Sequence, residues 1–187
     1  MRRKSLLVLL SVVLALAAGC SKKETGPRTY TAPDGSFSVV LPGMVGDMEM
    51  EEKEIDSPMG KKMLSVHSAE GKNIVFTIKV LERGVPDNDE AAVREIQAGG
   101  MKAIMGDGEI TKKGEIEIDG RNAFHARFKK EINGKTGYVE AVEIYAGGMQ
   151  HQFQVLTYDE SKLDDPAVME YFKSFKYLEE ETGEGEE

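Results

Sequence analysis

Apolar and polar residues alternate along most of the chain, which is the pattern of half-buried β-strands. Glycine-containing pairs, Asp119-Gly120, Asn133-Gly134 and Gly147-Gly148, separate the later segments. Such pairs are favoured at the positive-φ positions of tight hairpins, so the second half of the chain predicts an antiparallel meander. The expected strands cover residues 30–32, 37–41, 48–51, 64–67 and 74–80, and then 109–118, 122–132, 136–145 and 150–158.

Two stretches follow a helical period instead. The first starts near Asp87-Asn88-Asp89, whose side chains suit a helix N-cap, and it ends at residues 106–108. Gly99-Gly100 lies inside it, which predicts either close packing on a sheet or a break. The second starts at Asp165-Pro166, an N-cap residue followed by Pro at the first helical position. Strands interrupted by one helix and closed by another predict an α+β fold, an antiparallel β-sheet flanked by helices.

The first twenty residues have a different character. A basic start, Arg2-Arg3-Lys4, precedes a run from Leu6 to Ala18 that is apolar apart from Ser11. Thirteen residues are too few to cross a bilayer as a helix, which takes about 20, so the run predicts a secretory signal peptide.

The signal ends in the sequence LAAGC at residues 16–20, which resembles the bacterial lipobox. In that family of signals the Cys thiol receives a diacylglyceryl group and the chain is cut just before it. We therefore expect residues 1–19 to be removed and Cys20 to carry the lipid anchor. Ala17 stands where Leu is commoner, and an ordinary cleaved signal with a free thiol is the alternative. Ser21 after the Cys favours the outer membrane over the inner.

The predicted organisation is a signal peptide (1–19), a lipidated Cys and tether (20–28), a folded α+β domain (29–178) and an acidic tail (179–187). The 187 residues carry a formal charge of −9, which becomes −12 when Arg2, Arg3 and Lys4 are removed. Because nucleic-acid binding needs a basic face, no nucleic-acid partner is expected. The single Cys excludes an intrachain disulfide and any paired-cysteine zinc or redox site.

The segment YTAPDGSFSVVLPG at residues 30–43 resembles the opening of PsbP-like domains, with an aromatic, a Gly-Ser-Phe core and a Pro-Gly stop. Residues 119–124 (DGRNAF) and 171–175 (YFKSF) also fit that family. The resemblance spans roughly residues 29–177 and implies an α/β/α sandwich around an antiparallel sheet. Known members of the fold bind proteins, including a photosystem complex and a nuclear import partner, and are not enzymes. No residue for photosystem docking can be carried over.

Catalytic patterns are absent from the sequence. The three histidines, His67, His125 and His151, have no metal-ligand spacing, and each is expected at the surface or at a strand end. His125 in particular is expected to face solvent. Glu115 and Glu117 share one strand face, which is expected to be the wet side. We expect no catalytic residue and no cofactor.

Methionines are the one sharper candidate for chemistry. Thioether and imidazole ligands suit Cu(I), so a methionine cluster followed by a histidine is a candidate copper site. Met48 and Met50 share a strand face, however, and could instead fill gaps in the core. The candidate ligands are Met44, Met48, Met50, Met63 and His67, with Met59 between them.

These observations favour a non-enzymatic lipoprotein of the cell envelope, facing the periplasm and held at the membrane through Cys20. Its expected role is that of a binding or accessory module for an envelope protein complex. The alternative is a protein that handles a small ligand or Cu(I). An enzyme is the third possibility.

Overall fold

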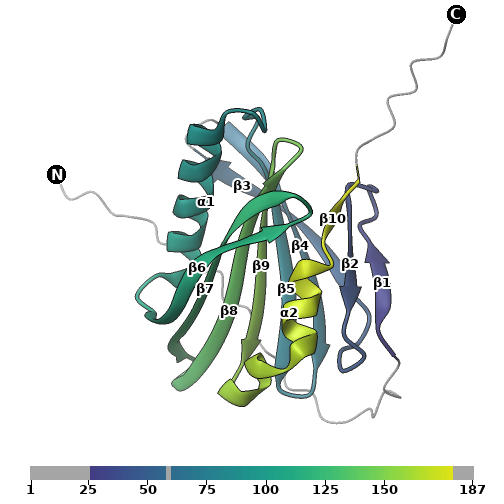
Figure 1. Ribbon diagram of the computed structural model, residues 1–187, viewed down its shortest axis with the longest axis vertical. Helices are drawn as coiled ribbons and strands as arrows, with labels where there is room; N and C mark the ends of the chain where they lie inside the picture. Colours follow the sequence, from purple (N-terminus) through teal and green to yellow (C-terminus); the bar gives the residue numbers. More distant parts are fainter. Residues whose placement is uncertain (1–25, 58–59, 179–187) are drawn as a thin grey trace, which may run out of the picture.

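The computed structural model describes residues 26–57 and 60–178, which form two antiparallel sheets and two α-helices (Figure 1). The predicted signal peptide, Cys20, Ser21, Met59 and the acidic tail at residues 179–187 lie outside the described residues. The elements in chain order are β1 (Arg28–Thr31), β2 (Phe37–Leu41), β3 (Glu49–Ser57), β4 (Gly60–Gly71), β5 (Ile74–Glu82), α1 (Glu90–Met105), β6 (Glu109–Ile118), β7 (Arg121–Ile132), β8 (Lys135–Ala146), β9 (Met149–Thr157), the 3-10 helix η1 (Glu160–Asp164), α2 (Pro166–Lys173) and β10 (Lys176–Tyr177).

The larger sheet has seven strands in the order β3-β4-β5-β9-β8-β7-β6, so β3 and β6 are its two edges. The four last strands form the expected meander, and β9 then returns beside β5. The smaller sheet has the order β1-β2-β10. It contains the expected first hairpin, closed by the C-terminal end of the described chain.

The tight turns of the meander adopt the backbone that their sequences predict. Asp119 and Gly120 have φ of 52° and 72°, and Asn133 and Gly134 have φ of 53° and 73°. Positive φ at both central residues is the type I′ turn, whose twist matches that of the flanking strands. The turn sequence therefore fixes the register of β6, β7 and β8.

The β3–β4 hairpin is longer than expected, because residues 49–57 and 60–71 form strands where only 48–51 and 64–67 were expected. The added residues are rich in Glu and Lys and lack an apolar alternation. They need none, since β3 is an edge strand and most of its side chains lie in solvent.

Helix α1 covers one face of the seven-stranded sheet, and α2, η1 and the small sheet cover the other (Figure 1). Both caps are as expected. Asp89 accepts a hydrogen bond from Ala92 N at 3.1 Å, and Asp165 accepts one from Ala167 N at 2.9 Å before Pro166. The architecture is thus the expected α+β fold with helices on both faces of an antiparallel sheet.

The main core lies on the α2 face of the sheet. Aromatic rings from β2, β5, β9 and α2 meet edge to face, for example Phe76 with Tyr171 at 4.9 Å between centroids. A smaller cluster holds the C-terminal half of α1 through Met101 and Ile104. The largest buried rings are Phe37, Phe76, Phe128, Phe153, Tyr171, Phe172 and Phe175.

Neither helix among the described residues is long and apolar enough to cross a membrane.

Candidate functional site

The structure brings part of the predicted copper set together. Met50 on β3 lies directly opposite His67 on β4, and both face the α2 side of the sheet, where the His67 ring lies 5.3 Å from that of Phe37. Met50 is 43% exposed, so it does not fill a core gap as one reading of the pattern predicted. Met44 and Met48 are the ones that pack against the core, and Met63 is 51% exposed.

His67 already has partners on both ring nitrogens. Its Nδ1 lies 2.8 Å from the Tyr30 hydroxyl, and its Nε2 lies 3.2 Å from Ser65 Oγ. Burial lowers the pKa of His67, and Asp34 opposes that shift only in part. A metal at this position would have to displace one of the two hydroxyls. Within residues 26–57 and 60–178, no three His, Cys, Asp or Glu side chains are grouped to hold a metal ion.

The expectation that the histidines lie at the surface is wrong, because His67, His125 and His151 are all buried. His151 has no exposed area, lies against Phe37 and Phe175, and has no hydrogen-bond partner for either nitrogen. Burial lowers the pKa of His151 to about 4, so it is neutral near pH 7. The alternating pattern was ambiguous here, since both faces of β9 are covered.

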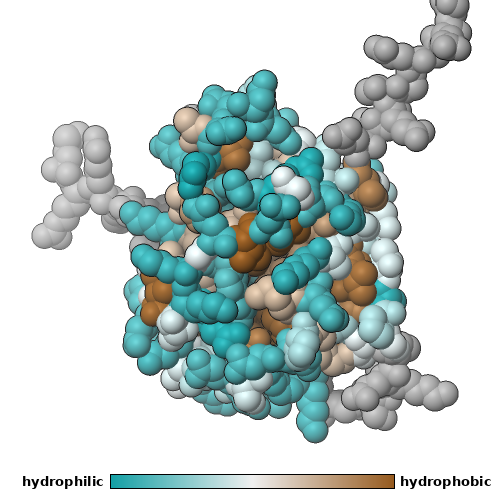
Figure 2. Space-filling model, viewed as in Figure 1, coloured by the Kyte–Doolittle hydropathy of each residue, from teal (hydrophilic) through white to brown (hydrophobic). Residues whose placement is uncertain are grey.

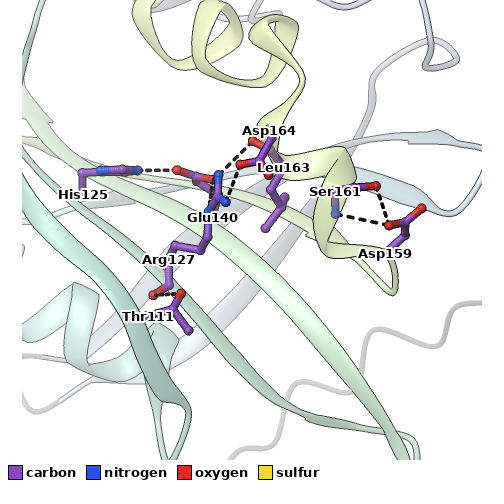
Figure 3. Close-up of polar contacts among 8 residues, drawn as sticks. All are labelled: Thr111, His125, Arg127, Glu140, Asp159, Ser161, Leu163 and Asp164. Atoms are coloured by element: carbon purple, nitrogen blue, oxygen red, sulfur yellow. Dashed lines mark hydrogen bonds and ion pairs between the residues drawn. The ribbon is translucent and has the colours of Figure 1, made fainter.

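His125, expected in solvent, belongs instead to a buried ionic network shown in Figure 3. Its Nε2 donates to Glu140 Oε1 at 2.6 Å, and Arg127 Nε donates to Glu140 Oε2 at 2.7 Å. Burial raises the pKa of Glu140, but these donors outweigh it and the net shift is downward. Arg127 also bonds Asp164 Oδ1 and Leu163 O, so the network ties the sheet to η1. Both carboxylate oxygens of Glu140 and all three guanidinium nitrogens of Arg127 are used in this structural role.

On the opposite face of the sheet, several polar side chains lie beneath α1 and form a layer between the sheet and the helix. Gln150 Nε2 donates to the buried carboxyl oxygen Glu143 Oε1, and Arg83 Nε donates to Gln150 Oε1 at 2.6 Å. From the helix, Gln97 Nε2 donates to the backbone oxygens of Asn122, at 2.9 Å, and Glu143, at 3.4 Å. The N-terminal half of α1 therefore rests on hydrogen bonds, whereas its C-terminal half rests on apolar contacts.

Glu143 is the most perturbed carboxyl of this polar layer. It has no exposed area, its Oε2 has no hydrogen-bond partner, and burial raises its pKa to about 8. Gln150, Gln152, Arg83 and Lys79 oppose this shift without cancelling it. Glu143 is therefore largely protonated at neutral pH. Gly100 explains how the helix comes so close, because a Cβ there would lie 2.7 Å from Glu143 Cδ.

Two hollows border α1. The first, about 290 Å³, lies between the N-terminal half of the helix and the β6–β7 hairpin. It is lined mainly by polar groups, including Arg94, Gln97, Asn122 and Tyr145. Several of its charged groups are already engaged: Arg94 pairs with Glu115 at 2.5 Å, and Asp87 accepts from Gly147 N and Gly148 N, each at 2.9 Å.

The second hollow, about 400 Å³, lies between the C-terminal half of α1 and strands β6 and β7. Its floor is apolar, with Met101, Met105, Ile110 and Phe124 among the lining residues. Figure 2 shows that hydrophobic atoms on the viewed face gather in small patches and hollows between hydrophilic side chains. An apolar hollow open to solvent is the usual mark of a binding surface.

The hollows and the perturbed carboxyl lie in different places. Glu143, the carboxyl with a pKa suited to proton transfer, is sealed under α1 and lines neither of these hollows. Glu115 and Glu117 are exposed, as expected for the wet side of a strand. The polar layer was not predicted, although Gln150, Gln152 and Gln154 alternate along β9. Of the two alternatives predicted for Gly99-Gly100, close packing is confirmed at Gly100, whereas a Cβ at Gly99 would meet nothing within 4 Å.

Comparison with known proteins supports the fold. No family model and no curated protein matches the sequence. The solution structure of cyanobacterial PsbP from Synechocystis sp. PCC 6803 superposes with a TM-score of 0.56 at 10% identity, covering 87% of this chain and 99% of that one. A crystal structure from Bacteroides thetaiotaomicron superposes with a TM-score of 0.52 at 12% identity, covering 83% of this chain and 49% of that one. The described domain therefore has a PsbP-like fold.

Proposed function

We propose that this chain is a lipid-anchored, non-enzymatic binding module of the cell envelope that serves as an accessory to a protein complex. The N-terminal sequence supports the anchor, because a basic start and a short apolar run end in LAAGC at Cys20. With Ser21 next, the outer membrane is the favoured location. The domain then faces the periplasm on a tether of residues 21–27, one residue shorter than the sequence predicted, because Arg28 begins β1.

The observation that carries the binding role is the apolar hollow between α1 and β6. Soluble domains seldom leave apolar side chains open to solvent in a hollow unless something covers them. The fold alone does not decide the function, since one fold serves many sites. The hollow is a specific surface feature of this chain, and it lies away from the α2 face that holds the main core.

In-cell crosslinking of the tagged, membrane-bound protein, followed by mass spectrometry, tests the accessory role. One dominant envelope protein in the crosslinked product is the expected result. A monomer with no crosslinked partner under conditions that capture known envelope complexes would overturn the proposal.

The anchor has a separate test. Cys20→Ser removes the lipid acceptor, so the protein should leave the membrane fraction for a soluble or unprocessed pool. Ser21→Ala is the matched control and should leave the membrane fraction unchanged. An unchanged membrane fraction in Cys20→Ser would overturn the anchor.

A second candidate function, Cu(I) handling, has one observation in its favour, the cross-strand placement of Met50 opposite His67. Titration of the purified protein with Cu(I) would give tight, stoichiometric binding that the paired Met48→Leu and Met50→Leu substitutions abolish. If the wild-type protein shows no tight binding, or if the substituted protein binds equally well, copper handling is excluded.

A further inference from the structure

Strand β6 is an edge of the seven-stranded sheet, and among the described residues it pairs only with β7. One row of its backbone N–H and C=O groups therefore faces outward without a strand partner. Nine of its ten residues are exposed or half-exposed, and only Ile118 is buried. An extended peptide can add a strand to such an edge, with main-chain hydrogen bonds supplying affinity.

The apolar hollow lies on the α1 side of this same edge. Ile110 and Lys113 project from β6 on that side, since they lie opposite Phe128 and Ala126, which face α1. Ile110 is 44% exposed and lines the hollow together with Met101 and Met105 of the helix. A strand added to β6 would place every second side chain on the same side as the hollow. Flexible methionines adapt readily to different apolar side chains.

The charge at this edge selects the partner. Glu109 pairs with Lys129 at 3.1 Å, and Glu115 pairs with Arg94 at 2.5 Å. Lys112 and Lys113 lie between them, are exposed, and have no ion-pair partner within the part of the chain that the structure describes. Glu117 is also exposed and has no ion-pair partner among the described residues, but it lies near the end of the strand, four residues beyond Lys113. The centre of the edge therefore carries a surplus of positive charge on a chain whose net charge is −9.

We propose that β6 and the adjoining hollow bind an extended peptide segment of a protein partner by strand addition, with apolar residues on one face and acidic residues near Lys112 and Lys113. This inference rests on the proposed accessory role and names the chemistry of the partner. A second copy of the chain is the other possible occupant of this edge, and the test below distinguishes it from a peptide partner.

The test is selection from a phage-displayed library of random ten-residue peptides on the purified mature protein. The expected peptides alternate apolar residues with intervening or flanking Asp or Glu. Ile110→Glu places a negative charge, the same sign as that of the acidic peptides, at the mouth of the apolar hollow. It should weaken the affinity for the selected peptides by about tenfold or more. Lys113→Glu should weaken the acidic peptides by a smaller factor, with an effect that shrinks at high salt.

Met50→Glu on the opposite edge strand is the matched control, because Met50 and Ile110 are 43% and 44% exposed and both lie on edge strands. It should leave peptide affinity unchanged. The inference is overturned if no peptide is enriched, if Ile110→Glu and Met50→Glu have equal effects, or if sedimentation shows a dimer that Ile110→Glu dissociates. A failed anchor or crosslinking result does not affect this selection, which uses neither membrane nor native partner.

Discussion

The two faces of the central sheet differ in the kind of side chain that lies between the sheet and its covering elements. On the α2 side, rings such as Phe76, Phe153 and Phe172 fill the space between the sheet and its cover. On the α1 side, Glu143 and Gln150 occupy the equivalent depth and hydrogen-bond to one another beneath the helix. Burial of apolar area stabilises a fold far more than burial of hydrogen-bonded polar groups, whose net contribution is small.

The difference separates two tasks within one sheet. On the α2 face, the small sheet, which contains both ends of the described chain, packs against the larger sheet. The apolar contacts of this face therefore supply most of the stability. The α1 face is left with a polar layer, two hollows and an uncovered edge strand, which suit recognition. Burial also acts on opposite kinds of ionisable group, since it keeps Glu143 protonated on one face and His151 neutral on the other.

The largest expected effect comes from removing a ring of the α2 face. Phe153→Ala should lower the free energy of unfolding by about 3–5 kcal/mol, because it leaves a cavity among several aromatic side chains. Ile104→Ala, in the small cluster under α1, should cost only about 2 kcal/mol. Urea denaturation followed by circular dichroism measures both. Equal losses would contradict the assignment of the main core to the α2 face.

Glu143→Gln should make the protein less sensitive to alkaline pH. The pKa of Glu143 is about 8 in the folded state against 4.5 as its ordinary value, so the folded state holds a proton that the unfolded state has lost. Wild-type stability therefore falls as pH rises from about 4.5 to 8. Each pKa unit corresponds to about 1.4 kcal/mol, so the variant should gain a few kcal/mol at pH 9 and little at pH 4.

Glu140→Gln is the control for that measurement and should behave in the opposite way. The pKa of Glu140 is lowered, so its contribution is present above its ordinary pKa of 4.5 and is lost as pH falls through the lowered value. Removing its charge takes the buried counter-charge from half-buried Arg127 and should destabilise the protein at neutral pH. Urea denaturation at a series of pH values separates the two variants. If the stability of both variants changed with pH in the same way, the opposite pKa shifts assigned to Glu143 and Glu140 would be contradicted.

His151→Leu should protect the protein from acid. The folded-state pKa of His151 is about 4 against an ordinary 6.5, so the unfolded state binds a proton that the folded state refuses. Wild-type stability is therefore lost as pH falls from 6.5 toward 4. The advantage of the leucine variant over wild type should widen by about 2 kcal/mol between pH 7.5 and pH 5. A constant difference between the two proteins would show that His151 is not held neutral.

The smallest effect tests the close approach of α1 to its polar layer. Gly100→Ala should destabilise by roughly 1 kcal/mol net, because the clash with Glu143 and Gln150 exceeds the gain in helix propensity. Gly99→Ala is the matched control, since a Cβ there meets nothing within 4 Å, and it should stabilise by up to about 1 kcal/mol. Thermal unfolding of both variants gives the answer. If both substitutions stabilised the protein, the side chains of Glu143 and Gln150 would be able to move aside at little cost.

Local chemistry made much of the fold predictable. Asp-Gly and Asn-Gly pairs placed the hairpins, and Asp89 and Asp165 placed both helix starts, because each effect depends on a few neighbouring residues. The β3–β4 hairpin was underestimated, since an edge strand in solvent carries no apolar alternation. The histidines were misplaced for the opposite reason: His125 and His151 sit in strands that are covered on both sides, where polar residues do not mark the outer face.

The sequence by itself determined the class of fold and the order of the strands within the meander, both of which depend on short-range patterns. Only the tertiary structure decided which face became the aromatic core, that Glu143 lies sealed beneath Gly100, and that Ile110 opens into a hollow with Met101. Those outcomes depend on contacts between residues far apart in the chain. A pKa is shifted by burial only once residues distant in sequence pack around the group, and a hollow forms only between elements that pack together. No local sequence pattern specifies these long-range contacts.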